Sequence, residues 1–444
     1  MSLPAGPGGP ALLHAIRLGL QPQEFLLQCH RRYGDAFTIR IPGRPTQVVF
    51  SHPDAVKAIF TGSEDTLRAG EANVILEPVL GTHSLLLLDG AQHLRERRLM
   101  LPPFHGERMQ AYGEAMRDIT DAAIDRWPIG RAFPLHEEMQ SITLDVILRT
   151  VFGMEDGAQL GALRASLLRL LAVATSPLLL MTFLRRDLGP LTPWRRFVAL
   201  RAEVDALLYA ELARRRTTGT AERTDILSML MEARDEQGNP MTDVELRDEM
   251  ITLLLAGHET TATTLAWAVC RILEHPDVLA RLQAERAVVC GDGPVTAEHV
   301  GALTWCDATV KEALRLTPII QFVGRILRAP MQIGGWDLPA GTMAAPCIFL
   351  THHRADVWPD PERFDPARFL DAKPGPYAFF PFGGGVRRCI GMAFAMFEMK
   401  VVLAQVLGRL TLRLVPGYRA EIVRRSITLA PSKGMPVIVE RRAA

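Results

Sequence analysis

The sequence has few lysines and no excess of either charge. Five of its 50 basic residues are lysine, and its 49 acidic residues leave a formal net charge of +1. Proteins that bind nucleic acid through its phosphates need a basic surface, so this balance argues against a nucleic-acid-binding protein. With 48% hydrophobic and 22% charged residues, the composition is that of an ordinary globular protein with enough apolar residues for a large core.

Cysteines are also few, and they follow no common disulfide or metal-binding pattern. There is no C-x-x-C pair and no spacing typical of a zinc site. In a chain of 444 residues, scattered cysteines are typical of free thiols in a reducing compartment. The six are Cys29, Cys270, Cys290, Cys306, Cys347 and Cys389.

The first 20 residues lack the pattern of a signal peptide or of a membrane span. They begin with a short stretch rich in proline and glycine, and they have no apolar core of the kind that a signal peptide needs. A membrane span takes about 20 consecutive apolar residues, which this segment does not offer. We therefore expect a cytoplasmic protein with no membrane anchor.

The most informative stretch is Phe382-Gly-Gly-Gly-Val-Arg-Arg-Cys389-Ile-Gly391. An apolar stretch follows it and predicts a helix, whose N-terminal dipole would favour a thiolate at Cys389. Gly385 permits a turn with positive φ, and Gly391 permits close approach of the backbone to a flat ligand. Arg387 can bind a carboxylate with two hydrogen bonds. A thiolate beside such an arginine suits a haem, although a buried structural cysteine in a glycine-rich turn is the simpler alternative.

This stretch resembles the cysteine loop of the cytochrome P450 superfamily of haem-thiolate monooxygenases, whose pattern is Phe-x-x-Gly-x-Arg-x-Cys-x-Gly. The resemblance implies that Cys389 is the proximal iron ligand of a haem b. It also implies that Phe382, Arg387 and Gly391 belong to the cofactor site. The implied fold is mainly α with a small β region, formed by residues 1–444 as a single large domain.

Hydrophobic periodicity agrees with a mainly helical chain. It predicts helices over 53–60, 91–100, 113–126, 135–152, 161–174, 194–216, 243–275 and 392–410. Alternation in 36–41 and 47–50 predicts a hairpin, and 68–88 shows no single period and predicts a long loop. The apolar run 176–184 is either core or a lid over a hydrophobic ligand, and in the family this connection covers the substrate entrance.

The long central helix carries residues that a buried helix normally avoids. It begins with a capping box, Thr242 to Glu245, and extends about 50 Å at 1.5 Å per residue. Gly257 in its middle costs about 1 kcal/mol relative to alanine, and a buried Glu259 needs a partner. A helix kink with threonine hydroxyls bonded to carbonyls explains the glycine and one threonine, but not the adjacent acid and threonine.

In the P450 superfamily a small-Gly-x-acid-Thr segment lies over the distal face of the haem. The resemblance implies that Thr260 hydrogen-bonds iron-bound dioxygen and that Glu259 helps to relay protons. It also implies that Ala256 leaves room for dioxygen and substrate beside the cofactor.

Four basic residues are candidates for binding the haem propionates. His93 and Arg97 lie four apart on one helical face, and periodicity alone favours a solvated basic surface, because Arg95 and Arg98 lie on the same helix. The resemblance assigns both to a propionate, together with Arg325 and Arg387. It also implies a buried structural cluster of Glu312, Arg315 and Arg363, a pocket-lining stretch at 319–324 and a C-terminal hairpin at 427–434.

The implied activity is insertion of one atom of dioxygen into a hydrophobic small molecule, such as a fatty acid, terpenoid or polyketide. Electrons would come from a separate ferredoxin or flavodoxin system, and the protein is expected to be a monomer. Two alternatives remain. One is a peroxygenase of the same fold that uses hydrogen peroxide, and the other is a haem-binding carrier or sensor without turnover.

Overall fold

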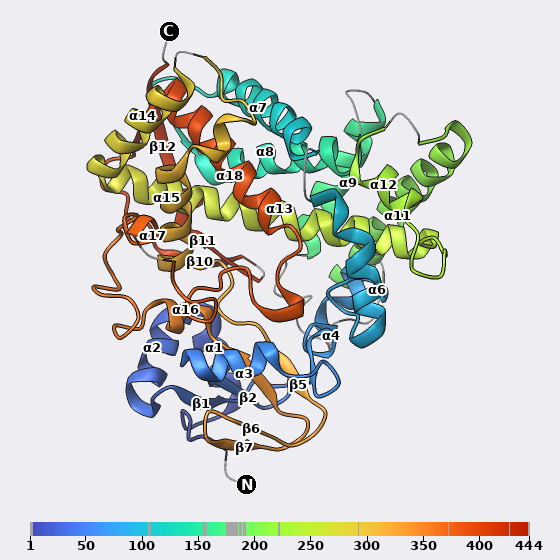
Figure 1. The fold of residues 1–444 in the computed structure, drawn as a ribbon, viewed down its shortest axis with the longest axis vertical. Helices are drawn as coiled ribbons and strands as arrows, with labels where there is room; N and C mark the ends of the chain where they lie inside the picture. The colour runs from blue at the N-terminus through green and yellow to red at the C-terminus, as the bar shows by residue number, and fades with distance from the viewer. Residues whose placement is uncertain are drawn as a thin grey trace.

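The computed structural model describes residues 3–104, 108–153, 158–174, 185, 189, 192–220, 223–291, 293–371, 373–425 and 427–442. A small β-rich part and a larger helical part together form the molecule (Figure 1). The two chain ends lie at opposite ends of the view in Figure 1. The predicted mainly α fold with a small β region is therefore confirmed.

The β-rich part is built around a five-stranded sheet of order β1-β2-β8-β5-β3. Its strands are β1 (Ala36–Ile39), β2 (Gln47–Phe50), β8 (Met343–Pro346), β5 (Arg325–Leu327) and β3 (Leu67–Arg68). The predicted hairpin is β1 and β2, which pair antiparallel, whereas β2 and β8 pair in parallel. This sheet therefore joins the N-terminal hairpin to a strand almost 300 residues later, and it places Arg325 at the start of β5.

Three smaller sheets complete the β structure. They contain β4 (Ala132–Pro134), β12 (Pro436–Arg442) and β9 (Leu410–Leu414), the pair β10 (Ile422–Arg425) and β11 (Thr428–Pro431), and the pair β6 (Met331–Ile333) and β7 (Trp336–Leu338). The C-terminal hairpin is β10 and β11, of which the predicted range 427–434 covers only β11 and the 3₁₀ turn after it, and its strand β11 packs on the long central helix.

The helices of the N-terminal third are α1 (Ala11–Leu20), α2 (Pro22–Tyr33), α3 (Pro53–Thr61), α4 (Ala69–Ala72), α5 (Glu77–Leu80), α6 (Gly90–Met100), α7 (Arg108–Arg126) and α8 (Leu135–Thr150). Four further helices lead to the end of the central helix: α9 (Ala158–Ala174), α11 (Pro193–Thr218), α12 (Ile226–Glu232) and α13 (Asp243–Glu274). The last are α14 (Pro276–Cys290), α15 (Thr304–Leu316), α16 (Ile348–His352), α17 (Arg368–Asp371) and α18 (Met392–Arg409).

The prediction of a continuous loop over 68–88 was wrong, because α4, α5 and the 3₁₀ turn Val74–Leu76 lie within it. The predicted apolar run 176–184 lies outside the described residues.

The central helix α13 organises the helical part and crosses the middle of the molecule (Figure 1). Its capping box is present: the Glu245 amide donates to the Thr242 hydroxyl at 3.2 Å, and the Thr242 amide donates to the Glu245 carboxylate at 2.7 Å. It packs against α8, α15, α18 and β11. Because neighbours surround it, its residues are apolar on several faces and most of them are buried.

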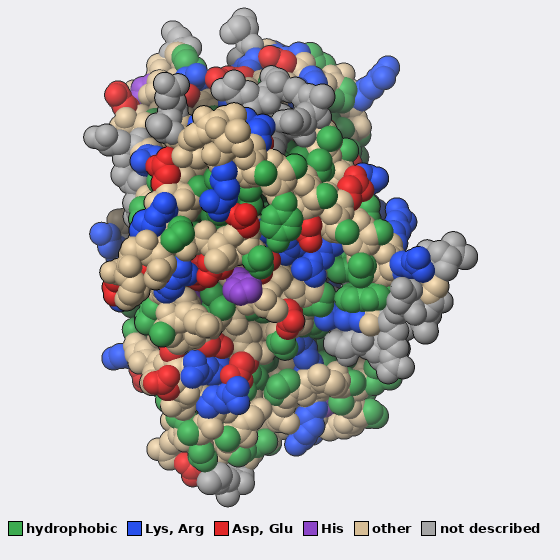
Figure 2. All heavy atoms as spheres, turned by 90° about the vertical axis from the view of Figure 1, so that its right-hand side faces the viewer, with side chains coloured by type: hydrophobic (Ala, Val, Ile, Leu, Met, Phe, Trp, Pro, Cys, Tyr) green, Lys and Arg blue, Asp and Glu red, His purple; other side chains and the backbone are tan. Residues whose placement is uncertain are grey.

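The described surface and thiols agree with the composition. On the face shown in Figure 2, acidic and basic side chains are interspersed, and no large area of one sign stands out. The five cysteines other than Cys389 are buried and free, and burial raises the pKa of each, to about 12 for Cys270 and Cys347. The described residues contain no helix that is long and apolar enough to cross a membrane, and they contain no cluster of three or more histidine, cysteine or acidic side chains arranged for a metal.

Candidate active site

The cysteine loop is a tight turn that requires glycine. Gly383 and Gly385 have φ angles of 69° and 64°, and a Cβ on Gly385 would lie 2.1 Å from the carbonyl oxygen of Phe60. The Cys389 amide closes the turn by donating to the Phe382 carbonyl at 2.9 Å. Gly391 is the N-cap of α18, and no atom lies within 4 Å of where its Cβ would be, so space is open beside it.

The Cys389 side chain is accessible although protein atoms surround its sulfur. The residue is exposed, yet the burial around its sulfur is enough to raise the pKa of the thiol. A hydrogen bond from the Gly391 amide and the charges of Arg97 and Arg388 act in the opposite direction and favour the thiolate. A cation bound to the sulfur would add to these effects, because a metal ion deprotonates a coordinating thiol.

Another wall of the site is the middle of α13. Ala256 is exposed between buried Leu254 and buried His258, so the helix opens on one side at this position. α13 also packs against α18, the helix that begins directly after the cysteine loop. Gly257 faces α8 instead, where a Cβ would lie 2.9 Å from the side chain of Ile147. Its lack of a side chain therefore allows α8 and α13 to pack closely.

The adjacent Glu259 and Thr260 have different surroundings. Thr260 is half-buried, and its hydroxyl donates to the Ala256 carbonyl at 2.5 Å, as in the simpler alternative of a threonine bonded back to its own helix. Glu259 instead meets α8 and β11, accepting a hydrogen bond from the Gln140 amide at 2.6 Å and lying 3.5 Å from the Thr263 and Thr428 hydroxyls. Burial raises the pKa of Glu259, and these donors partly offset that rise.

The four predicted propionate-binding residues lie near one another. Burial, followed by the neighbouring charges of Arg387, Arg97 and Arg325 in that order, lowers the pKa of His93 to about 3. Burial also lowers the pKa of Arg325, to about 10, with a contribution from Arg387. We call His93, Arg97, Arg325 and Arg387 the basic cluster. Like charges gathered in this way destabilise one another unless an anion lies between them.

Two acidic residues balance the basic cluster only in part. The Arg387 guanidinium donates to Glu64 at 3.1 Å and to the Leu85 carbonyl at 3.0 Å, and it also contacts Asp89 and the Leu88 carbonyl. Asp89 in turn accepts the amides of Ala69 and Gly70, both at 2.9 Å. Arg387 is therefore already well bonded within the protein.

The remaining three members of the basic cluster have spare donor capacity. The His93 Nδ1 atom is buried and has no hydrogen-bond partner, although Glu64 lies 3.2 Å away. The Arg325 guanidinium donates only to the carbonyl of the preceding Gly324, at 2.8 Å, and the Arg97 guanidinium makes no hydrogen bond or ion pair with any described residue. A ligand that carries carboxylates and lies beside Cys389 fits this donor set.

The predicted structural cluster is present, but one of its members was wrong. Arg315 donates to both carboxylate oxygens of Glu312, at 2.7 and 2.9 Å, and both side chains are fully buried. The second arginine beside Glu312 is Arg368, at 3.4 Å, and not Arg363. Arg363 is exposed and contributes its backbone carbonyl to Arg315 at 3.1 Å. The sequence offers two similar segments, each with arginine before phenylalanine, and only the second points its side chain inward.

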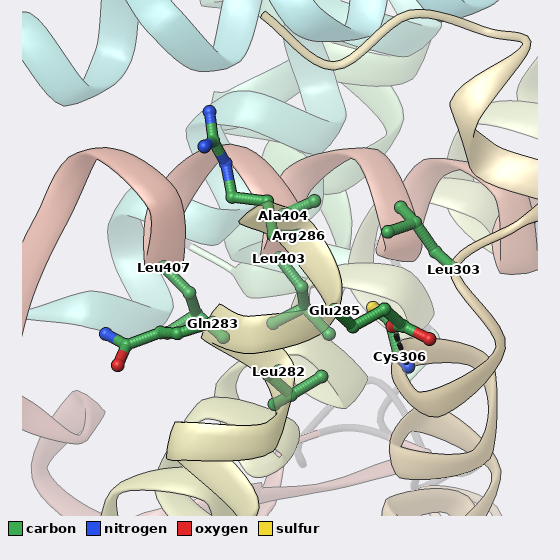
Figure 3. Close-up of a pocket in the computed structure, with 9 residues that line it drawn as sticks. All are labelled: Leu282, Gln283, Glu285, Arg286, Leu303, Cys306, Leu403, Ala404 and Leu407. Atoms are coloured by element: carbon green, nitrogen blue, oxygen red, sulfur yellow. Dashed lines mark hydrogen bonds between the residues drawn. The ribbon is translucent and has the colours of Figure 1, made fainter. Parts of the chain in front are cut away.

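A crevice between α14, α15 and α18 lies away from this site (Figure 3). It is lined by Leu282, Gln283, Glu285, Arg286, Leu303, Cys306, Leu403, Ala404 and Leu407. Glu285 accepts the amides of Trp305 and Cys306, at 2.5 and 2.9 Å, so it caps the start of α15. Leu403 is 14 residues beyond Cys389 along α18, which places it roughly 20 Å away at 1.5 Å per residue. The crevice is therefore a structural feature of the helix packing.

Sequence reasoning missed several groups at the candidate site. Glu64 and Asp89 are ordinary loop and cap residues by pattern, and only the fold brings them to Arg387. Gln140 and His136 share one face of α8, four residues apart, which was the available signal. Nothing in the sequence indicates that this face meets Glu259.

Comparison with known proteins identifies the family to which these features belong. The family model described as "Cytochrome P450" matches residues 4–437. A protein of Mycobacterium tuberculosis named "Putative cytochrome P450 135B1" is 43% identical over 99% of this chain and 92% of its own length. A second one from that organism, "Putative cytochrome P450 135A1", is 36% identical over 99% of this chain and 96% of its own.

Solved structures agree with this relationship over the whole chain. One is described as "Retinoic acid bound cyanobacterial CYP120A1", with a TM-score of 0.85 and 26% identity over 100% of both chains. Another is the haem domain of cytochrome P450DA, with a TM-score of 0.87 and 26% identity over 100% of this chain and 99% of that one.

Proposed function

This chain belongs to the cytochrome P450 family, and on that premise we propose that it inserts one oxygen atom into a hydrophobic small molecule. Members of the family are haem-thiolate enzymes that use haem b, so the general activity is that of a haem monooxygenase. The observation that carries the proposal for this chain is the position of Cys389 beside Arg97 of the basic cluster, together with the exposed Ala256 on the neighbouring helix α13.

The residues present fit a haem b. Cys389 would supply the thiolate ligand, and the open space beside Gly391 would receive the edge of a flat macrocycle. The unpartnered Nδ1 of His93 and the donors of Arg97 and Arg325 would bind the two propionates, with Arg387 holding the loop at 85–89 in place. When bound, the haem supplies dioxygen binding and cleavage of the O–O bond.

On the α13 side, the chain's own residues would position the ligands of the haem and supply protons to them. Ala256 leaves space beside the half-buried Thr260, whose hydroxyl would turn from the Ala256 carbonyl toward the ligand. Glu259, whose pKa is raised by burial, holds a proton to higher pH than an exposed carboxyl group does and can release it toward Thr260. These roles separate a monooxygenase from a carrier or sensor, which would not need an acid beside the threonine.

The finer points of the activity are also proposals. The related structure described with retinoic acid bound supports a lipophilic substrate, in the range of fatty acids, terpenoids and polyketides. We propose that electrons come from a separate ferredoxin or flavodoxin system. The monomeric state and the cytoplasmic location stay predictions from the sequence.

The thiolate assignment is tested by the spectrum of the reduced protein with carbon monoxide. The purified protein should show the red-shifted Soret band of a thiolate-bound haem, and Cys389→Ala should lose it. A well-folded wild type without the band, or a Cys389→Ala variant that keeps it, would contradict the assignment.

The monooxygenase role is tested by Thr260→Ala, measured as product formed per NAD(P)H consumed with redox partners present. Haem content and substrate binding should stay unchanged, whereas product should fall, because loss of general acid–base catalysis costs about 10²–10⁴ in rate. An unchanged ratio would mean that Thr260 serves only the helix. Product formed with hydrogen peroxide but never with redox partners would instead favour a peroxygenase.

A further inference from the structure

A buried polar network connects Glu259 to the protein surface. It involves three elements that pack together: α8, α13 and the β10–β11 hairpin. At its inner end, Glu259 accepts from Gln140 through one carboxylate oxygen, and the other oxygen lies 3.5 Å from the Thr263 hydroxyl. At its outer end is Arg425, which is exposed at the end of β10.

His136 is the link between the two ends, and its tautomer follows from its partners. The side chain is fully buried, and its Nδ1 lies 2.9 Å from Nη1 of Arg425. Because a guanidinium can only donate, Nδ1 must accept, and the ring proton is therefore on Nε2. That proton is donated to the Thr263 oxygen, 3.1 Å away, which leaves the Thr263 hydroxyl proton free to point at Glu259.

Two further polar side chains of the described residues lie beside this network, His258 and Thr428. His258 contacts the Thr143 hydroxyl at 3.1 Å, and its charge and that of Arg425 help burial to lower the pKa of His136 to about 3. Thr428 is 2.9 Å from the Arg425 carbonyl and 3.5 Å from Glu259, so its hydroxyl can serve only one of them at a time. The imidazole of His136 is therefore neutral at rest, with one acceptor toward the surface and one donor toward Glu259.

We propose that Arg425, His136 and Thr263 form a hydrogen-bonded arm through which Glu259 exchanges protons with solvent. When Arg425 moves aside, water can protonate Nδ1 of His136. Nε2 then passes its proton to the Thr263 oxygen, and the Thr263 hydroxyl proton moves to Glu259. One proton thus enters for each proton that Glu259 takes up. Rotation of the imidazole ring while Arg425 is displaced then exposes Nε2 to water, which protonates it as Nδ1 gives its proton back to water, and this restores the starting tautomer. Gln140 holds the second oxygen of Glu259 in place and is a positioning residue.

The inference deepens the proposed function, on which it rests, but its first test needs no turnover. The infrared carboxyl band of Glu259, identified by its loss in Glu259→Gln, is followed against pH in the haem-containing protein. Arg425→Ala removes a positive charge that favours the carboxylate, so the band should persist to higher pH than in the wild type. Arg424→Ala is the matched control, because this neighbouring arginine donates to the Leu18 carbonyl at 3.1 Å and not to His136.

The second test separates proton exchange from simple positioning. Glutamine at position 136 can accept from Arg425 and donate to Thr263, but it has no basic nitrogen that could be protonated during the transfer. His136→Gln should therefore leave the band near its wild-type pH range and still lower product per NAD(P)H by roughly tenfold or more. Thr263→Val should lower product in the same way.

The outcomes distinguish failure of the arm from failure of the proposed function. A wild-type product ratio in His136→Gln, or an Arg425→Ala band that titrates as in the wild type and in Arg424→Ala, would overturn the arm. Failure of the proposed function would instead appear in the wild type itself, as a missing thiolate band or as no product with any electron source. In that case the infrared titrations would still report whether Arg425 and His136 control the protonation of Glu259.

Discussion

The Glu312 site and the basic cluster both contain arginines inside the protein, and they differ in how many hydrogen bonds those arginines make. At the Glu312 site, the Arg315 guanidinium donates to Glu312 and to the carbonyls of His352, Pro361 and Arg363, all between 2.7 and 3.1 Å. These contacts use all five of its N–H groups. In the basic cluster, by contrast, the Arg97 guanidinium and the Nδ1 atom of His93 have no hydrogen-bond partner among the described residues.

The difference shows how a structural arginine is distinguished from a ligand-binding one. A closed set of hydrogen bonds holds α15 to the segment at 352–368 and leaves no donor for a ligand. An open set of like charges is costly unless something else completes it, and the sulfur of Cys389 next to Arg97 indicates what that ligand must approach. The first site therefore supports the fold, and the second is ready to bind an anionic group.

The largest expected effect comes from breaking the closed site. Arg315→Met would leave the fully buried Glu312 without its main partner. Removing one partner of a buried ion pair costs about 3–5 kcal/mol of unfolding free energy. Urea unfolding followed by tryptophan fluorescence measures this loss, and the double variant Arg315→Met with Glu312→Leu should recover part of it. A loss below about 1 kcal/mol for Arg315→Met would contradict a structural role.

The open site should respond in the opposite way. Arg97→Met removes no bond within the protein, so the unfolding free energy of the polypeptide should change little. A hydrogen bond to a charged group is worth about 1.5–3 kcal/mol, so haem should be lost roughly 10- to 100-fold faster. Transfer of haem to an excess of apomyoglobin measures the rate.

Arg98→Met is the matched control for this experiment. Arg98 is the next residue of α6, is exposed, and pairs with Glu236 at the surface. Its loss should leave haem release unchanged. Equal rates in the two variants would show that Arg97 does not hold the cofactor.

The two arginine sites also show which parts of the fold and of the candidate site could be predicted from the sequence. Local signals gave the strong elements: the capping box at Thr242 predicted α13, and the glycine-rich turn before Cys389 predicted a loop followed by a helix. The motif pattern also brought together His93, Arg97, Arg325 and Arg387, which come from three distant segments.

The rest depends on side-chain direction and on packing between distant segments. Arg363 and Arg368 stand in similar local sequences, and only the turn between them decides which guanidinium reaches Glu312. The short helix α4 within 68–88 begins where Asp89 accepts its N-terminal amides, a contact some 20 residues away in sequence. The network of His136 and Arg425 likewise depends on the packing of α8 against the C-terminal hairpin.

A smaller effect should separate the two arginines at the closed site. Arg368 lies 3.4 Å from Glu312, so Arg368→Met should lower the unfolding free energy by about 1–2 kcal/mol. Arg363→Met should change it by less than about 0.5 kcal/mol, because that side chain is exposed and its useful group is the backbone carbonyl. The same urea titration measures both. A larger loss for Arg363→Met than for Arg368→Met would restore the original assignment from the sequence.

The smallest effect concerns the pH dependence of the closed site. His352 is fully buried, and its Nε2 accepts the Phe380 amide at 3.0 Å, so the ring is neutral in the folded state. Burial, with help from the charges of His353 and Arg315, lowers the pKa of His352 well below 6.5. Between the lowered pKa of the folded state and the ordinary pKa of about 6.5 in the unfolded chain, the unfolded chain binds a proton that the folded chain does not. The free energy of unfolding therefore falls as pH decreases through about 6.5.

One histidine of this kind should cost about 0.7 kcal/mol of unfolding free energy between pH 7 and pH 6. His352→Gln keeps an acceptor for the Phe380 amide but removes the titrating ring, so the loss of stability over this interval should shrink by about that amount. His52→Gln is the control, because the His52 side chain is 45% exposed and lies outside the Glu312 site. If His352→Gln and the wild type lose stability equally over this interval, the ring does not stay neutral in the folded protein, and the closed site is less shielded from solvent than its hydrogen bonds indicate.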